Sequence, residues 1–480
     1  MFFNSIEFAI FLPIVFLLYW FVFNRSLRLQ NAFLVTASYF FYGFWDWRFL
    51  FLIAFSSLVD YTIGLLLGRF ERDSVRRALL ITTLSVNLGF LGFFKYFNFF
   101  SLSFARAFTF FGMPIDDPIL LEIILPVGIS FYTFQTLSYS IDIYRGKLKP
   151  TKDIVAFFAF VSFFPQLVAG PIERAKNLLP QILKRRQFNS EKAVDGMRQI
   201  LWGLFKKILI ADHCAVYANQ IFANYESYSG STLLLGAVMF GLQIYCDFSG
   251  YSDIAIGTAR LFGISLMKNF AFPYFSRDIA EFWRRWHISL STWFRDYVYI
   301  PLGGSQSSRG KCIRNIFIIF IISGFWHGAK WTFIVWGAIN ALYFIPLMLA
   351  SRNRNNLDTV AEGKRLPSIN EMLQMAMTFF IVTIAWVFFR SPSVMSAVEY
   401  IQGIFTASML SMPTVEIAKL DIILLLVFFA TEWFQREKEH GLQMSHGPKG
   451  RLVRWIIYYA LFSLILNNKA DPQQFIYFQF

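Results

Sequence analysis

Two histidines in the second half of the chain lie among charged and aromatic side chains in strongly apolar surroundings. His287 belongs to the charged stretch 281–296, and His327 lies in an apolar run between residues 316 and 335. A charged group at membrane depth costs about 2.5–3.5 kcal/mol, so such a stretch indicates a site. Imidazole accepts a proton near neutral pH, as a general base must when an activated acyl group is attacked. The alternative is structural, with arginines that reach a membrane interface and a histidine packed in the core.

The residues around His287 have the spacing of one helix face. If residues 279–299 form a single helix, His287, Ser291 and Arg295 fall at positions i, i+4 and i+8 and share a side. The aromatic side chains of the same stretch are typical of a membrane interface. We therefore expect a helix that lies along the membrane boundary or lines a wet cavity.

Small residues flank His327. Gly324 lies about one turn before it, Gly328 follows it directly, and Trp326 precedes it. Glycines in a membrane helix commonly allow two helices to pack closely. They could equally open room for a substrate to reach the imidazole, with Trp326 as a supporting or channel-lining residue. The sequence leaves both interpretations open.

Acidic residues occur at two further places. Asp247 and Asp253 lie near the end of an apolar segment, where the sequence allows either a loop with turn chemistry or a cavity-lining role. Glu281 and Arg285 are four residues apart, and an ion pair between them would partly neutralise both charges. Neither the spacing of a metal site nor a glycine-rich phosphate loop occurs in the sequence, so we predict no metal ion.

The composition indicates an all-α protein that crosses a membrane many times. Of 480 residues, 56% are hydrophobic and 15% are charged, whereas soluble domains carry about 25% charged residues. At about 20 residues a span, the apolar runs predict about eleven to thirteen transmembrane helices. The sequence lacks the alternating pattern of a membrane barrel. The widely spaced Cys214, Cys246 and Cys312 predict buried thiols rather than disulfides.

The net charge of +14 fits basic loops beside anionic lipid and does not support nucleic-acid binding. The basic loops at residues 25–28 and 69–77 are expected in the cytoplasm, which puts the N-terminus outside the cytoplasm. The sequence suggests a break after Lys95, followed by an interfacial or re-entrant segment at 96–118. A Pro–Gly break at 126–128 interrupts the next apolar run.

Several ordered motifs resemble the membrane-bound O-acyltransferase family. The histidine-bearing stretches 284–297 and 324–328 carry the resemblance, and within the family they resemble the branch that acetylates bacterial exopolysaccharides such as alginate. Other similar stretches are residues 125–132, 164–171, 245–253 and 299–304. The resemblance follows the chain in order over about residues 1–345 and is loose beyond them.

The resemblance implies a ring of tilted helices around a thinned central channel. His327 would be the catalytic residue and His287 its polar partner beside the channel. The family uses no bound cofactor, and acetyl-CoA is the expected cytoplasmic acyl donor. Its phosphates could be attracted by the basic residues 184–186 and 206–207, although lipid headgroups explain these charges equally well.

The resemblance also implies partners and a location. The acceptor would be a periplasmic SGNH-type acetyltransferase or esterase-like protein, or the polysaccharide itself. Membrane lipids would surround a multi-pass protein of the bacterial inner membrane. We expect one integral domain over 1–480, with N-terminal helices (1–170), a cytoplasmic surface segment (171–200), a catalytic core (201–350), C-terminal helices (351–470) and an aromatic tail (471–480).

The aromatic tail has a likeness of its own. Residues 471–480 resemble the aromatic tail of the small partner protein in teichoic-acid D-alanylation, where a tyrosine is proposed to carry the acyl group. By this likeness, Tyr477 would enter the extracytoplasmic mouth of the channel and act as an acyl relay. The alternative is an aromatic anchor at the membrane interface.

These observations favour an O-acyltransferase that moves an acetyl group from acetyl-CoA across the membrane for O-acetylation of an extracytoplasmic polysaccharide such as alginate. D-alanyl or peptidoglycan O-acyl transfer by the same scaffold is the first alternative. A transporter would suit the broken segment 126–128 and the buried charges, but the sequence has no paired hydrophobic halves.

Overall fold

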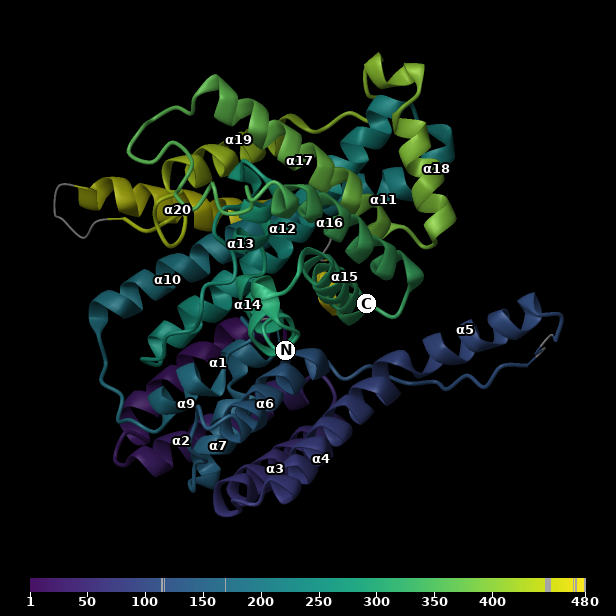
Figure 1. Cartoon of the computed structure of the whole chain (residues 1–480). Helices are drawn as coiled ribbons and strands as arrows, with labels where there is room; N and C mark the ends of the chain where they lie inside the picture. Colours follow the sequence, from purple (N-terminus) through teal and green to yellow (C-terminus); the bar gives the residue numbers. More distant parts are fainter. Residues whose placement is uncertain are drawn as a thin grey trace. The chain divides into compact units, whose positions relative to one another are not determined.

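The structure is a computed structural model that describes residues 1–113, 115, 117–168, 170–444, 450–468, 470 and 473–478. All regular elements in these residues are helices (Figure 1), which confirms the predicted all-α class. The chain divides into two compact units. The first comprises Met1–Ala193 and Thr258–Met267, and the second Val194–Gly257 and Lys268–Phe480.

The first unit is built from helices of very different lengths, from 4 to 22 residues. They are α1 (Ile6–Leu17), η1 (Leu18–Val22), α2 (Leu27–Gly43), α3 (Arg48–Arg69), α4 (Asp73–Leu91), η2 (Gly92–Tyr96), α5 (Phe97–Phe110), α6 (Ile129–Tyr144), α7 (Ile154–Ser162), α8 (Phe164–Leu167) and α9 (Ala175–Ile182). Here α2 packs on α7, while α6 packs on α3 and α4. Helix α10 (Ser190–Leu204) then leads from the first unit into the second.

The second unit holds both candidate histidines. Its elements are η3 (Phe205–Ala211), α11 (Asp212–Ala223), η4 (Tyr225–Ser227), α12 (Gly230–Leu261), η5 (Pro273–Phe275), α13 (Ile279–Arg285), α14 (Ile288–Phe294), η6 (Arg295–Tyr299), η7 (Gly304–Gln306), α15 (Arg309–His327), α16 (Trp331–Leu349), α17 (Ile369–Arg390), α18 (Val394–Ile404), η8 (Ala407–Leu410), α19 (Lys419–Phe434), α20 (Arg451–Asn467) and η10 (Ile476–Phe478). Helix α15 packs along α16, and α16 packs on α17.

Several helices can cross a membrane. In the described part of the chain, five are long and apolar enough to do so: Arg48–Arg69, Asp73–Phe110, Gly230–Leu261, Trp331–Leu349 and Ile369–Arg390. Ile6–Val22 is a shorter apolar helix. The protein is therefore a multi-pass membrane protein. The number of eleven to thirteen spans stays a prediction, because many of the other helices are shorter than the roughly 20 residues that a bilayer requires.

Of the two breaks expected in the first unit, the structure contradicts one and confirms the other. The break suggested after Lys95 is wrong, because a π-helical turn joins α4 and α5 into one helix, Asp73–Phe110. Helix α6 begins only after the Pro–Gly break, at Ile129, and Gly128 directly before it has a φ of 75°. A Cβ at Gly128 would also collide with the carbonyl oxygen of Leu167. Glycine is thus required both by the backbone conformation and by the close approach.

The three cysteines are as predicted. Cys214, Cys246 and Cys312 are all free and buried. They fill the interior as small apolar side chains.

Candidate active site

The second unit brings His287 and His327 together. Their ring centroids are 6.3 Å apart, and both residues are buried, with 1% and 3% of their surface exposed. His327 is the last residue of α15, whereas His287 lies between α13 and α14. Trp326 contacts both imidazoles, with its ring centroid 5.7 Å from His287 and 5.0 Å from His327. The two histidines therefore share one aromatic environment.

The single helix expected over residues 279–299 is wrong. α13 and α14 are separate helices, and His287 between them has a left-handed backbone with φ 42°. This conformation is unfavourable for a residue with a Cβ and persists where the surroundings determine it, often at functional sites. The kink removes His287 from the helical register of Ser291 and Arg295. All three nevertheless line the same cavity.

Polar contacts hold the kink in place. The predicted ion pair is confirmed, since Arg285 lies 2.8 Å from Glu281. Arg277 lies 3.1 Å from the same carboxylate. After the kink, the Ile288 backbone N–H donates to the carbonyl oxygen of Asn269 at 2.9 Å. The strained conformation of His287 is thus fixed by bonds on both sides of it.

Gly324 and Gly328 pack α15 against α16. A Cβ at Gly324 would collide with the carbonyl oxygen of Phe333, and one at Gly328 would collide with the ring of Phe333. The neighbouring atoms fill the space that each glycine leaves. The structure thus supports helix packing and contradicts the interpretation that these glycines make room for a substrate.

We expect Gly324→Ala to destabilise the protein by about 1–3 kcal/mol, as overpacking does, because backbone atoms cannot move aside. Gly310→Ala is the matched control in the same helix, since a Cβ there meets nothing within 4 Å. The control should be neutral or slightly stabilising, because alanine favours a helix. Thermal unfolding of the two purified variants in one detergent measures the difference, and equal midpoints would contradict the packing role.

A cavity of about 1040 Å³ reaches both histidines. Its apolar walls come largely from α14, α15 and α16. Its charged lining residues are Arg284, Arg295, Arg309 and Arg354, and hydroxyl groups are supplied by Ser291, Ser305, Ser307, Ser323 and Ser351. Arg295 is exposed and pairs with Asp296 at 2.7 Å. The cavity therefore combines basic groups with an apolar interior and two imidazoles.

His287 is a buried, neutral imidazole beside the cavity. Among the described residues, neither of its ring nitrogens has a hydrogen-bond partner. Burial lowers the pKa of His287 to about 3, so the ring is neutral at physiological pH. A neutral imidazole has one N–H donor and one acceptor nitrogen. Because buried polar groups almost always find partners, a polar ligand such as a carbonyl group would complete this environment.

Tyr477 contacts both histidines. Its ring centroid lies 5.5 Å from that of His327 and 6.3 Å from that of His287. Tyr477 does not occur among the described residues that line the cavity, so the two imidazoles connect the cavity with the phenol. Desolvation raises the pKa of Tyr477 well above its usual value. Its hydroxyl therefore needs a base before it can act as a nucleophile. Asp471, Pro472, Gln479 and Phe480 of the predicted tail lie outside the described residues.

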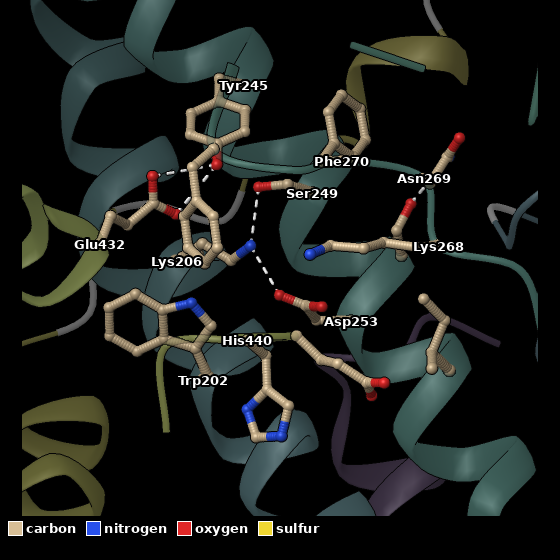
Figure 2. A pocket seen from close by; sticks show the side chains of 14 residues that line it. Trp202, Lys206, Tyr245, Ser249, Asp253, Lys268, Asn269, Phe270, Glu432 and His440 are labelled. Carbon is tan, nitrogen blue, oxygen red and sulfur yellow. Dashed lines mark hydrogen bonds and ion pairs between the residues drawn. The ribbon is translucent and has the colours of Figure 1, made fainter. Parts of the chain in front are cut away.

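Asp247 and Asp253 both lie within α12, so the interpretation of a loop with turn chemistry is wrong. Lys207 pairs with Asp247 at 2.9 Å, and Lys206 pairs with Asp253 at 2.7 Å. Figure 2 shows Lys206 bonded to both Ser249 and Asp253. The hollow beside them, about 20 Å³, has room for roughly one water molecule. Asp253 lines this hollow, whereas Asp247 contacts the segment that carries Tyr477.

The prediction that residues 206 and 207 attract donor phosphates is wrong. Lys206 and Lys207 are 3% and 0% exposed and are paired with carboxylates. Arg186 is also buried, and it donates to the side chains of Gln30 and Asn31. Lys184 and Arg185 are exposed, so a role in attracting phosphates stays a prediction for them alone.

The cavity has basic lining residues besides Arg295 that were not predicted from the sequence. Arg309 follows the serine-rich loop before α15, and Arg284 and Arg354 come from separate segments. The only signal was the polar sequence 305–311 between two apolar elements. From the sequence, Lys207 was interpreted as part of a basic loop. Its ion pair with Asp247 could be found only from the structure.

The chain is similar in sequence to known proteins over most of its length. Residues 148–389 match the family model described as MBOAT, membrane-bound O-acyltransferase family. "Probable alginate O-acetylase AlgI" of Pseudomonas aeruginosa is 39% identical over 84% of this chain and 74% of that protein. The peptidoglycan O-acetyltransferase of Helicobacter pylori is 35% identical over 82% of this chain and 77% of that protein.

A more distant relative is named for the transfer of a D-alanyl group rather than an acetyl group. The teichoic acid D-alanyltransferase of Bacillus subtilis is 29% identical over 45% of this chain and 57% of that protein. The family match covers half of the chain, and the alginate and peptidoglycan relatives cover most of it. The chain belongs to the membrane-bound O-acyltransferase family and is an O-acyltransferase of the membrane.

Proposed function

We propose that this O-acyltransferase moves an acetyl group from cytoplasmic acetyl-CoA across the bacterial inner membrane to an extracytoplasmic polysaccharide such as alginate. One observation carries the proposal: two buried imidazoles line a large cavity and also contact the phenol of Tyr477. The choice of acetyl and of a glycan is supported by the names of the alginate and peptidoglycan relatives.

The cavity suits a phosphate-bearing thioester. Its volume of about 1040 Å³ is at the upper end of small-molecule sites, which hold about 300–1,000 Å³. Arg284, Arg295, Arg309 and Arg354 would bind the phosphates of acetyl-CoA, since a guanidinium group matches a phosphate in two parallel hydrogen bonds. The apolar interior would take the uncharged arm of the donor and bring its acetyl group to the histidines.

We expect the double variant Arg309→Gln, Arg354→Gln to raise the KM for acetyl-CoA by about tenfold with little change in kcat. These arginines would bind ground state and transition state equally well, so their loss weakens only binding. The matched control is Lys311→Gln with Arg352→Gln, two exposed basic residues of the same segments that do not occur among the described residues lining the cavity. Initial rates over a range of donor concentrations measure both constants, and equal KM values for the two pairs would contradict the proposed donor site.

The positions of the three rings support the following proposed transfer step. His327 removes the proton of the Tyr477 hydroxyl, and the phenolic oxygen attacks the thioester carbonyl carbon. The N–H of neutral His287 donates to the carbonyl oxygen as negative charge develops on it. The C–S bond then breaks, and the thiolate takes the proton from His327. The products are an acetyl ester of Tyr477 and free thiol, with His327 regenerated.

The acetyl ester must then pass to an acceptor. We propose that a periplasmic SGNH-type acetyltransferase or esterase-like protein receives it and delivers it to the glycan, or that the glycan takes it directly. Ester exchange from a phenol to an alcohol is chemically favourable, because a phenolate is the better leaving group.

Inner membranes that contain this chain, supplied with radiolabelled acetyl-CoA, test the proposed function. Label should reach the protein first and then an alginate or other glycan fraction. D-alanyl transfer is the second candidate, supported by the distant D-alanyltransferase relative. Transfer from an activated D-alanyl donor with none from acetyl-CoA would overturn acetyl transfer in favour of this candidate.

A further inference from the structure

Lys207 is a buried lysine that lies between two carboxylates and a main-chain carbonyl group. It lies in the π-helical stretch η3 and is fully buried. Its Nζ is 2.8 Å from Asp212, 2.9 Å from Asp247 and 3.0 Å from the carbonyl oxygen of Gln473. The ammonium group donates hydrogen bonds to Asp212 and to the Gln473 carbonyl, and it forms an ion pair with Asp247. Two of these partners are carboxylates, and the third is main chain of a segment far away in sequence.

Asp247 completes a matching contact with the same segment. One of its carboxylate oxygens faces Lys207, and the other accepts the backbone N–H of Ile476 at 2.7 Å. The pair thus offers one donor and one acceptor to a peptide, and these meet a carbonyl group and an N–H three residues apart. Such contacts are strong because each involves a charged, buried group. Leaving them unmade would be unfavourable for the same reason.

A glycine allows this pair to form. A Cβ at Gly250 on α12 would lie 2.8 Å from the carbonyl oxygen of Gly203 and 3.2 Å from the backbone nitrogen of Lys207. The absence of a side chain at Gly250 lets η3 approach α12 closely enough for Lys207 to reach Asp247. The site is therefore built by the packing of two helices.

The contacts with the main chain set the positions of two aromatic side chains. Phe475 is completely buried, and its ring centroid lies 4.3 Å from that of Tyr251. The Tyr477 ring lies 4.4 Å from Phe248, one turn earlier on α12. The backbone is held immediately before Tyr477, and the phenol ring lies beside both histidines.

We propose that Lys207 and Asp247 form a binding site for peptide main chain, which holds residues 473–476 of this chain and thereby positions Tyr477 against His327. Both are positioning residues, since they act through the segment and not on the acyl group. Their effect on catalysis rests on the proposed acyl relay, whereas the docking of the segment does not. Because the site binds backbone atoms, it tolerates changes in the side chains of Gln473 and Gln474.

A thiol reporter in the full-length protein tests the docking. Ile476 is 1% exposed, so Ile476→Cys puts a thiol where it is shielded while the segment is held, and the native cysteines are buried. In this background Asp247→Asn should raise the rate of maleimide labelling at position 476 by about tenfold or more. It should lower kcat for acyl transfer to a similar extent, with the KM for the donor within about twofold, since the donor cavity is untouched.

Two controls separate this effect from general damage. Asp195→Asn also removes a carboxylate from an ion pair, that with His440, and Gln474→Ala changes an exposed side chain of the segment. Both should leave labelling and kcat within about twofold of the parent. Labelling of the Asp247→Asn protein at the parental rate would overturn the proposal. So would a donor KM that changes together with kcat.

A second variant leaves the buried charges intact. Ile476→Pro removes the N–H that Asp247 accepts and shortens the side chain, at the first position of the turn η10, where proline is tolerated. Ile476→Val keeps the N–H and is its control. With a reporter cysteine at position 478, the proline variant should be labelled about tenfold faster and the valine variant at the parental rate. Equal rates would overturn the proposal even if Asp247→Asn failed to fold. Slow acyl transfer by Tyr477→Phe would support the acyl relay only. It has no bearing on whether residues 473–476 are docked.

Discussion

Replacing His327 by alanine is expected to lower acyl transfer by about 10²–10⁴-fold, the usual effect of removing a general base. Of the two imidazoles, His327 lies nearer to the Tyr477 ring. The ring centroids are 5.5 Å apart for His327 and 6.3 Å apart for His287. It also lines the cavity proposed for the donor, where it would exchange a proton with both reactants. The measurement is the initial rate of label transfer from radiolabelled acetyl-CoA, with donor binding followed separately.

A phenylalanine at the same position distinguishes chemistry from packing. The His327 ring packs against Trp336 and Phe389, each with ring centroids 5.3 Å away. His327→Phe keeps these aromatic contacts and removes only the ring nitrogens, so it should be as inactive as His327→Ala but more stable. His440→Ala, which removes another buried histidine, should retain transfer within a few-fold. Activity in His327→Phe would mean that the histidine serves only to pack the core.

The sequence was sufficient for the class of fold and for the pair of histidines. Long apolar runs predict helices because lipid leaves no other way to satisfy the backbone. A histidine in the apolar run 316–335 was also informative, because an imidazole in apolar surroundings requires a hydrogen-bond partner or has a function there. The resemblance of the motifs around His287 and His327 then added the family, which the comparisons confirm.

The shape of the site could not be predicted from spacing. A helical period assigns His287, Ser291 and Arg295 to one face, but a single left-handed residue at His287 interrupts the register. That strain is stabilised by contacts with Asn269 and with Arg277 through Glu281. Such contacts come from other segments, and no local pattern contains them.

Charge was the least reliable guide. Lys206 and Lys207 look in the sequence like a basic surface, yet each is buried beside a carboxylate of α12. Local sequence reveals a charge but not its partner, because Asp247 and Asp253 lie some forty residues further on. The glycines beside His327 illustrate the same limit, since only the position of Phe333 on α16 decides between packing and an open channel.

Tyr477→Phe is expected to reduce label on the protein and on the glycan by at least about 10²-fold, because it removes the oxygen that would accept the acyl group. Ring contacts with Phe248 and Phe475 do not involve the hydroxyl, so the segment should stay docked and the KM for the donor should not change. Mass spectrometry of the peptide that contains residues 473–478 should find the acetyl ester in the parent protein and not in the variant. Phe478→Leu, which changes the next aromatic residue, is the control and should keep most of the activity. If Tyr477→Phe acetylates the glycan at the parental rate, the acyl group passes directly from donor to acceptor. The phenol would then only pack against the two imidazoles on the side away from the cavity. The segment would have to be docked, but Tyr477 would not react.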